Sequence, residues 1–350
     1  MDRVVIRLGR KTIGDGRTCF LIAEAGVNHD GRLDRALRLV DVAANAGADA
    51  VKFQTFRADA LAAACAPQAA YQNRAAAARS QRDMLRRLEL NEAAHRALIA
   101  RCRKRAILFL STPFDEESAD LLERLDVPAF KLPSGELTNL PLLSHVARKR
   151  RPMLVSTGMA TLAEVRAAVR VIRRAGNPPL ALLHCVSSYP AEPAWSNLRA
   201  MATLRNAFRV PTGYSDHALG PEVSLAAAAL GAAVLEKHFT LDKNRPGPDH
   251  AMSMSPAELK AWVRSVRAVE SALGDGLKRP VPPEIPIARA ARKSLVAARP
   301  IALGERLTAG AVTRKRPGTG LPPAALTGLL GRRALRDIPA DALLSRRLFS

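Results

Sequence analysis

Short apolar runs rich in β-branched and aromatic residues recur along the first two thirds of the chain. They occupy residues 19–25, 50–54, 107–113, 129–134, 153–158, 180–187, 210–216 and 233–239. Between them lie segments with apolar residues at three- and four-residue spacing, typical of amphipathic helices, among them 33–47, 118–127 and 162–176. Alternating strands and helices of this number predict a (β/α)8 TIM barrel, and the alternative is a doubly wound parallel sheet. Polar residues at every predicted strand end favour the closed barrel.

One interval, between the second and third predicted strands, is about twice as long as the others. The excess is the Ala-rich segment 56–81, which precedes a helical pattern over residues 82–105. An insertion at the carboxyl-end rim of a barrel is well placed to cover a substrate, and an ordinary surface excursion is the alternative.

A Pro-rich stretch at residues 279–286 ends the strand and helix alternation and is typical of a linker. The following residues contain short β-prone pieces separated by turn residues. We therefore predict a barrel over residues 1–282, a linker over 283–291, and a small β-rich domain over 292–350.

Composition indicates a protein that stays in a reducing compartment. The four cysteines are widely spaced, with no CxxC pair, so the sequence predicts neither a zinc ribbon nor a disulfide framework. The amino-terminal residues lack the apolar core of a signal peptide, and the longest apolar run, 225–235, is too short to span a bilayer. We expect a cytoplasmic protein with no membrane partner.

The formal net charge is +22, and the sequence pI is about 11. Such a charge would ordinarily suggest a nucleic-acid partner. However, the basic clusters at 101–105, 148–151 and 314–316 are short, and no aromatic residues interleave with them. We favour solvated helix faces and expect no nucleic-acid partner, although a basic nucleic-acid-binding protein is the alternative from a different functional class.

Polar and ionisable residues gather where barrel enzymes carry their chemistry, at the carboxyl ends of the predicted strands. They are Glu24, Lys52, Gln54, Ser111, Thr112, Lys131, Ser134, Glu136, Ser156, Thr157, residues 184–189, Ser215, Asp216, His217, Glu236, Lys237 and His238. Burying two lysines in one barrel mouth is costly unless an anion pairs with them. Two lysines and several hydroxyl donors together predict a site for a phosphate and a carboxylate.

His217 and His238 end neighbouring predicted strands, so their imidazoles can converge on one point. Two histidines, completed by Glu24 or water, suit a divalent ion such as Mn²⁺ better than a closed structural zinc site. Within the seventh predicted strand, Ser215 shares a face with His217, whereas Asp216 points the other way. We expect Asp216 to orient a neighbour or to cap the following helix.

The sequence resembles the bacterial sialic acid synthases and their relatives that make nine-carbon 2-keto sugar acids. The stretches that carry the resemblance are IAEAGVNHDG, GADAVKFQTF, STPFDEES, KLPSGELTNLPLL, STGMAT, LLHCVSSYP, GYSDHALG, LEKHFTLDKNRPGPDHAMS and KRPGTG, in this order from residue 22 to 320. The last sixty or so residues resemble the antifreeze-like (SAF) domain of that family.

The resemblance implies a set of site residues. Phosphoenolpyruvate contacts are implied for Lys52, Thr112, Lys131, Ser134, Ser156, Ser187 and Ser215, and metal ligation for His217 and His238. Sugar contacts are implied for Gln54, Asn73, Tyr189, Asp249 and Arg316 of the partner subunit. The implied catalytic set is Glu24, Lys52, Lys131, Glu136 and Asp249. Relatives often carry asparagine or threonine where this chain has Ser187, so that contact is expected to differ.

The implied reaction joins phosphoenolpyruvate to the aldehyde of an open-chain N-acetylmannosamine-type sugar, adds water and releases phosphate. A divalent metal, Mn²⁺ before Mg²⁺ or Co²⁺, would polarise the aldehyde oxygen. Glu24 is the first candidate to activate the water and Asp249 the second. A second acceptor, 2,4-diacetamido-2,4,6-trideoxymannose, would give a legionaminic acid, and a barrel without activity is a further alternative. The family also implies a homodimer in which the small domain is swapped.

Overall fold

The computed structural model describes residues 4–67 and 80–350. The chain divides into two compact units, Met1–Gly274 and Asp275–Ser350. The first unit therefore ends at Gly274, eight residues before residue 282, where the sequence analysis expected the barrel to end. Asn73 lies outside the described residues.

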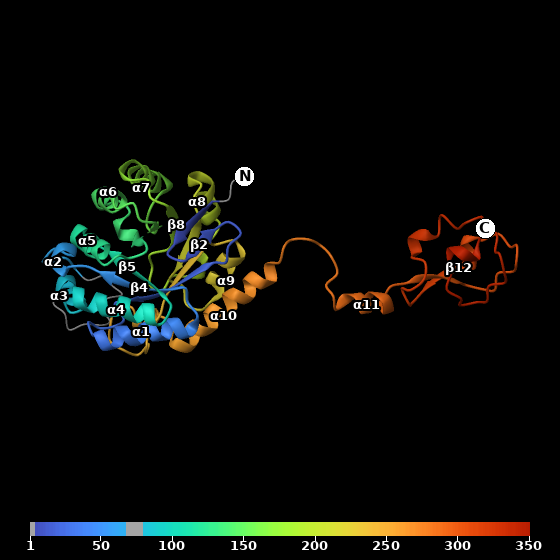
Figure 1. The fold of residues 1–350 in the computed structure, drawn as a ribbon, viewed down its shortest axis with the longest axis horizontal. Helices are drawn as coiled ribbons and strands as arrows, with labels where there is room; N and C mark the ends of the chain where they lie inside the picture. Colours follow the sequence, from blue (N-terminus) through green and yellow to red (C-terminus); the bar gives the residue numbers. More distant parts are fainter. Residues whose placement is uncertain (1–3, 68–79) are drawn as a thin grey trace. The chain divides into compact units, whose positions relative to one another are not determined.

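Eight parallel strands form the centre of the first unit (Figure 1). They are β3 (Phe20–Gly26), β4 (Ala50–Thr55), β5 (Leu108–Pro113), β6 (Phe130–Leu132), β7 (Met153–Ser156), β8 (Leu180–Cys185), β9 (Thr212–Asp216) and β10 (Val234–His238). The hydrogen-bonded order is β5-β4-β3-β10-β9-β8-β7-β6, and β5 lies against β6. The first strand β3 pairs with both its successor β4 and the last strand β10. This wrap-around pairing confirms the predicted barrel and excludes the doubly wound sheet.

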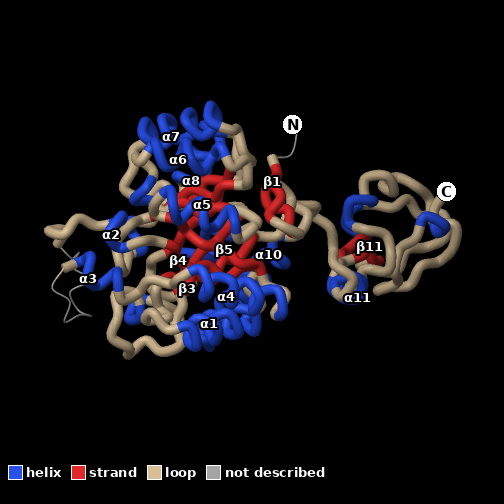
Figure 2. Tube along the Cα trace, turned by 60° about the vertical axis from the view of Figure 1, so that its left-hand side comes forward, coloured by secondary structure: helices blue, strands red, loops and turns tan. Residues whose placement is uncertain are grey.

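Helices surround this sheet (Figure 2). The barrel helices are α1 (Leu33–Ala46), α4 (Glu92–Lys104), α5 (Glu116–Arg124), α6 (Leu140–Arg148), α7 (Leu162–Ala175), α8 (Ala200–Phe208), α9 (Glu222–Ala229) and α10 (Pro256–Leu273), and the long interval adds α2 (Ala58–Leu61) and α3 (Gln81–Arg86). Local sequence fixes several helix starts. Two helices begin with a capping box that satisfies free amides of the first turn: Thr161 with Glu164 in α7, and Ser255 with Glu258 in α10.

None of the helices in residues 4–67 and 80–350 is long and apolar enough to cross a bilayer.

A hairpin that the strand periodicity did not predict precedes the barrel. It consists of β1 (Val5–Leu8) and β2 (Lys11–Gly14), paired antiparallel. Ile6, Leu8 and Ile13 of the hairpin are buried in the same apolar cluster as barrel-interior residues such as Phe20. Since β3 begins at Phe20, the hairpin closes the amino end of the barrel interior, opposite the strand ends that carry the polar residues.

Replacing Leu8 with alanine tests this closure. Leu8 is fully buried, so the substitution should lower the free energy of unfolding by about 3 kcal/mol. Val5 in the same strand is 41% exposed, and Val5→Ala should cost less than about 1 kcal/mol. Urea unfolding of both variants provides the measurement, and equal losses would show that the hairpin does not pack into the barrel.

The second unit begins with helix α11 (Glu284–Ala291), which occupies residues that the sequence suggested as linker. It continues with the antiparallel pair β11 (Ser294–Ala297) and β12 (Val312–Lys315) and several isolated bridges. The unit has its own apolar core, with Leu295, Ile301 and Leu344 fully or almost fully buried. A separate core is what an independently folded small domain requires.

Candidate functional site

A cavity of about 570 Å³ opens at the carboxyl ends of the barrel strands. Every strand contributes at least one polar side chain or thiol to its wall, either from its last residues or from the segment directly after it. These residues are Glu24, Lys52, Gln54, Thr112, Lys131, Ser134, Ser156, Cys185, Ser187, Tyr189, Ser215, His217, Glu236, His238 and Asp249. The barrel topology therefore brings together residues that are more than two hundred positions apart in sequence.

Strand alternation decides which side chains reach the cavity. Successive strand residues point to opposite faces of the sheet, so every second residue faces inward. Glu236 and His238 line the cavity, whereas Lys237 between them pairs outward with Asp216 at 2.8 Å. Asp216 also accepts a hydrogen bond from Ser224 in α9, so it anchors the following helix rather than the reacting groups.

Two lysines and two glutamates occupy the buried floor of the cavity. Lys52 Nζ lies 2.9 Å from Glu24 Oε2 and donates to Thr112 Oγ1 at 2.9 Å. Glu236 lies between the lysines, with its carboxylate oxygens 3.8 Å from Lys52 Nζ and 3.5 Å from Lys131 Nζ. The lysines therefore have carboxylate partners within the protein, which supply the paired anions that their burial requires.

The shared charges shift the protonation of these groups. Burial raises the pKa of Glu24 to about 7, although Lys52 opposes the shift. Burial would also raise the pKa of Glu236, but Lys131 and Lys52 outweigh it and lower that pKa. Burial lowers the pKa of Lys131, whereas for Lys52 the two glutamates overcome burial and raise the pKa. One carboxyl of the four-residue cluster is thus poised to exchange a proton near neutral pH, and protonated Glu24 leaves the cluster net positive.

Hydroxyl groups surround the Lys131 side of the cavity. Lys131 Nζ donates to Ser156 Oγ at 2.7 Å, and Ser215 Oγ donates to Glu236 Oε1 at 3.0 Å. Ser134 Oγ accepts from the backbone N–H of Gly158 at 2.9 Å. Cationic and hydroxyl donors at this density suit the oxygens of a phosphate or a carboxylate.

The opposite side of the cavity carries Gln54 and Asp249. Gly26 lies between them with φ +52°, and a Cβ atom there would come within 3.2 Å of Glu24 Oε1 and 3.5 Å of Asp249 Oδ2 and Gln54 Nε2. Glycine keeps this space open and allows the left-handed backbone. Burial raises the pKa of Asp249 to about 6.

The two predicted histidine ligands face each other, with ring centroids 5.5 Å apart. His217 Nδ1 lies 2.7 Å from the carbonyl oxygen of Val186, which can only accept, so Nδ1 carries a proton and Nε2 is the nitrogen left to bind a metal. Burial lowers the pKa of His217, but its contacts with Cys185 and Val186 outweigh burial and raise that pKa. Burial, reinforced by His217, lowers the pKa of His238 well below its usual range. Its Nδ1 atom is buried without a hydrogen-bond partner among the described residues and lies 3.9 Å from Asp249 Oδ2. Two facing imidazoles are side chains that a divalent metal can use as ligands.

Within residues 4–67 and 80–350, no three His, Cys, Asp or Glu side chains converge tightly enough for a fully protein-ligated metal site. A metal held by His217 and His238 alone would take its other ligands from water or substrate. An open coordination shell is typical of a catalytic metal and not of a structural one.

Comparison with known proteins agrees with this geometry. Residues 39–278 match the NeuB family, and residues 292–346 match the SAF domain. The chain belongs to the NeuB family. NeuB-family synthases are enzymes that depend on a metal, and this chain is accordingly an enzyme of the nonulosonic acid synthase class.

Individual relatives span nearly the whole chain. It is 45% identical to the N,N'-diacetyllegionaminic acid synthase of Legionella pneumophila, over 96% of both chains. It is 46% identical to the enzyme of the same name from Campylobacter jejuni, over 93% of this chain and 98% of the relative. The fold is also similar to the crystal structure of the sialic acid synthetase of Leptospira borgpetersenii in complex with citrate, with a TM-score of 0.73 and 34% identity. The superposition covers 81% of this chain and 94% of the Leptospira chain.

Most residues that the sequence singled out for this NeuB-family site line the cavity, and three others need separate description. Glu136, in a 3-10 turn at residues 134–136, accepts a hydrogen bond from Asn139 and is absent from the cavity wall. Asn73 lies outside the described residues. Arg316 belongs to the second unit, where its guanidinium donates to the carbonyl oxygen of Ala291.

The sequence analysis named Glu236 among the strand-end residues but gave it no role, whereas the structure places it between Lys52 and Lys131. The signal was available, because Glu236 lies two residues before His238 and so shares its inward face.

Sequence reasoning also missed an apolar wall, which no strand-end pattern could reveal. It consists of Val27, Leu61, Met84, Leu85, Leu88 and Phe114.

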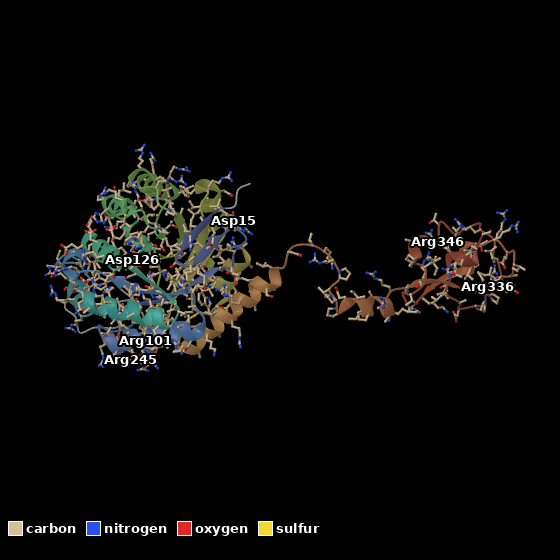
Figure 3. The ribbon with its side chains drawn as sticks, viewed as in Figure 1. Asp15, Arg101, Asp126, Arg245, Arg336 and Arg346 are labelled. Atoms are coloured by element: carbon tan, nitrogen blue, oxygen red, sulfur yellow. The ribbon has the colours of Figure 1, made fainter. Side chains whose placement is uncertain are left out.

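Basic side chains are distributed around each unit (Figure 3). Several are paired: Arg101 bonds Asp41, and Arg151 bonds Asp126.

Proposed function

We propose that this NeuB-family chain condenses phosphoenolpyruvate with the aldehyde of an N-acetylated mannosamine-type sugar, releasing phosphate and a nine-carbon 2-keto acid. The observation that carries the proposal is the cavity in which Lys52, Lys131 and the strand-end hydroxyls face His217 and His238. It supplies, in one buried place, donors for an anionic substrate and two imidazoles for a metal.

In this proposal the Lys131 side of the cavity holds phosphoenolpyruvate and the Asp249 side holds the sugar. Lys52, Lys131, Ser134 and Ser156 bind the phosphate and carboxylate oxygens and fix the enol carbon C3 toward the aldehyde. A divalent ion, Mn²⁺ first, held by His217 and His238, would supply Lewis acidity at the aldehyde oxygen.

A bond forms between C3 of phosphoenolpyruvate and the aldehyde carbon, while the C2–C3 double bond is lost and the aldehyde oxygen becomes an alkoxide. Water adds to C2 and gives one proton to Glu24, which passes it to the alkoxide to form the new hydroxyl. The C2–O bond to phosphate then breaks, and the C2 hydroxyl gives its proton to the departing phosphate and becomes the ketone. Glu24 is suited to this step because it lines the cavity and because its pKa lies near 7.

Between the two acceptors, two observations favour 2,4-diacetamido-2,4,6-trideoxymannose over N-acetylmannosamine. The relatives at 45% and 46% identity are diacetyllegionaminic acid synthases. The apolar wall formed by Val27, Leu61, Met84, Leu85, Leu88 and Phe114 also suits a sugar that carries a methyl group at C6 and a second N-acetyl group.

A phosphate-release assay with purified protein tests the proposal. Phosphate should appear only when Mn²⁺, phosphoenolpyruvate and one of the two sugars are present, and the trideoxy sugar should give the higher kcat/KM. No release with either sugar from folded, metal-loaded protein would refute the activity. A higher kcat/KM for N-acetylmannosamine would refute the acceptor choice alone.

The pH dependence of turnover should report Glu24. If its carboxylate accepts the proton, kcat/KM rises as pH increases through about 7 and falls as pH decreases below it. Glu24→Gln should remove this limb and lower kcat about 10²-fold. A Glu24→Gln enzyme that keeps the limb would assign the step to another group, with Asp249 the next candidate.

We further propose a homodimer in which Arg316 of the partner subunit contacts the sugar. In support, the segment that leads into the second unit carries exposed apolar side chains, which a second copy could cover. They are Leu273, Leu277, Val281, Ile285 and Ile287.

Arg316→Ala tests this arrangement. Activity should fall about 10- to 100-fold, as for a lost charge-assisted hydrogen bond, while Mn²⁺ binding by the barrel is preserved. Sedimentation should show a dimer for both proteins. Wild-type turnover in the variant, or a monomeric active enzyme, would contradict the partner contribution.

A further inference from the structure

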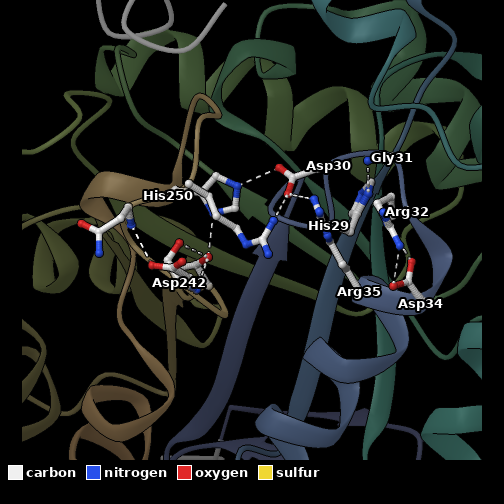
Figure 4. Close-up of polar contacts among 11 residues, drawn as sticks. His29, Asp30, Gly31, Arg32, Asp34, Arg35, Asp242 and His250 are labelled. Carbon is white, nitrogen blue, oxygen red and sulfur yellow. Dashed lines mark hydrogen bonds and ion pairs between the residues drawn. The ribbon is translucent and has the colours of Figure 1, made fainter.

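Two loops meet beside the Asp249 side of the cavity. One joins β3 to α1 and contains Asn28, His29 and Asp30. The other runs from residue 239 to 255, between β10 and α10, and contains Asp249 and His250. Figure 4 shows the buried ring of His250 held between groups from both loops.

His250 has a hydrogen-bond partner on each ring nitrogen. Its Nε2 lies 2.8 Å from Asp30 Oδ1, and its Nδ1 lies 2.6 Å from Thr240 Oγ1. A carboxylate can only accept, so Nε2 carries a proton. The single Thr240 hydroxyl proton can go to Nδ1 or to the carbonyl oxygen of Asp242 at 3.2 Å, and the Thr240 oxygen accepts from the backbone N–H of Asp242 at 3.2 Å.

The first loop presents Asp30 in a fixed orientation. Asp30 adopts φ +55°, a left-handed conformation that few non-glycine residues adopt. Its carboxylate also pairs with Arg35, and Arg245 lies 3.6 Å away. The neighbouring His29 accepts from the N–H of Gly31 through Nδ1, which further orders this turn (Figure 4).

A second connection reaches the backbone of Asp249 itself. Asn28 Nδ2 donates to the carbonyl oxygen of Phe239 at 2.8 Å and to Ser253 Oγ at 2.9 Å. Ser253 Oγ in turn donates to the carbonyl oxygen of Asp249 at 2.6 Å. The residue that lines the cavity is therefore held from both sides by contacts that originate in the β3–α1 loop.

We propose that His250 is a positioning residue for the sugar half of the reaction, holding Asp249 in the cavity by joining Asp30 to Thr240. The inference rests on the proposed function for its kinetic consequence. His250 does not line the cavity, so it acts only through the loop that carries Asp249.

Kinetics of His250→Ala separate positioning from general damage. Misplacing Asp249 by about 1 Å should lower kcat/KM for the sugar about 10²-fold, while KM for phosphoenolpyruvate stays within about twofold. In an Asp249→Asn background the same substitution should cost less than about threefold, because the group that it positions has already been altered. Equal costs in the two backgrounds would overturn the inference.

Two further variants sharpen the test. His250→Gln can still reach Asp30, so it should recover at least about tenfold of the lost kcat/KM relative to His250→Ala. The matched control is His145, whose Nε2 lies 2.7 Å from Asp120 on the outside of the barrel. His145→Ala should leave the kinetic constants within about twofold of wild type. A loss as large as that of His250→Ala would indicate a nonspecific effect and refute positioning.

Hydrogen exchange of the unliganded protein tests the loop contact without relying on activity. In His250→Ala, amides of residues 240–254 should exchange at least about tenfold faster, while those of the barrel strands remain unchanged. Unchanged exchange in the loop would refute the proposed contact. If wild type proved inactive with both sugars, the proposed function would fail, and the exchange result would still decide whether His250 holds the loop.

Discussion

Replacing Lys131 with methionine is expected to lower kcat for phosphate release about 10³-fold, as for the loss of a preorganised donor at a site of developing charge. Lys131 is 2% exposed and donates to Ser156. Methionine keeps most of the length of the side chain but removes the charge that we assign to phosphoenolpyruvate binding. Steady-state kinetics and calorimetric binding of phosphoenolpyruvate provide the measurement.

A matched control is available in Lys149. Its stem is also largely buried, but it pairs with Asp120 and Glu123 on the outside of the barrel. Lys149→Met should change kcat less than about twofold. If Lys131→Met bound phosphoenolpyruvate as tightly as wild type, the assignment of the Lys131 side of the cavity would be wrong.

Substitution of either candidate metal ligand is expected to have a comparable effect. His217→Ala and His238→Ala each remove one of the two imidazoles that the protein offers, so Mn²⁺ affinity should fall more than about 100-fold. Turnover should fall about 10³-fold, since a Lewis acid is worth several kcal/mol of transition-state stabilisation. Titration of free Mn²⁺ by electron paramagnetic resonance measures the affinity directly.

His184 serves as the control for these variants. It lies one residue before the end of β8, close to the cavity, but its Nε2 bonds the carbonyl oxygen of Ser196 and it does not line the cavity. His184→Asn should retain Mn²⁺ affinity. Wild-type Mn²⁺ affinity in both His217→Ala and His238→Ala would eliminate the proposed metal site.

Much of the fold was predictable because it depends on local periodicity. Apolar runs and amphipathic spacing located all eight barrel strands, and polar residues at their carboxyl ends located the site. Alternation along β9 correctly separated inward Ser215 and His217 from outward Asp216. The second unit was expected from a Pro-rich break. Part of that break is helical, since α11 begins directly after Pro282 and Pro283. Proline is compatible with a helix at its amino-terminal end.

Features that depend on contacts between distant segments were not predictable. The sequence analysis assigned no element to the amino-terminal hairpin. The hairpin packs against the barrel interior, and strand periodicity does not reveal contacts of this kind. The pairing of both lysines with Glu24 and Glu236 required the barrel to be closed first, as did the apolar wall. Glu136 was placed in the site by resemblance, but the turn after β6 directs it to Asn139.

The most direct test of the account is the fate of the bridging oxygen of phosphoenolpyruvate. With ¹⁸O between C2 and phosphorus, condensation by water addition at C2 breaks the C–O bond and leaves the label in inorganic phosphate. The ³¹P isotope shift of the released phosphate, in the presence of Mn²⁺ and the trideoxy sugar, measures this outcome. We predict fully labelled phosphate. Unlabelled phosphate, with ¹⁸O retained in the keto acid, would mean cleavage of the P–O bond and would contradict the chemistry proposed for this site.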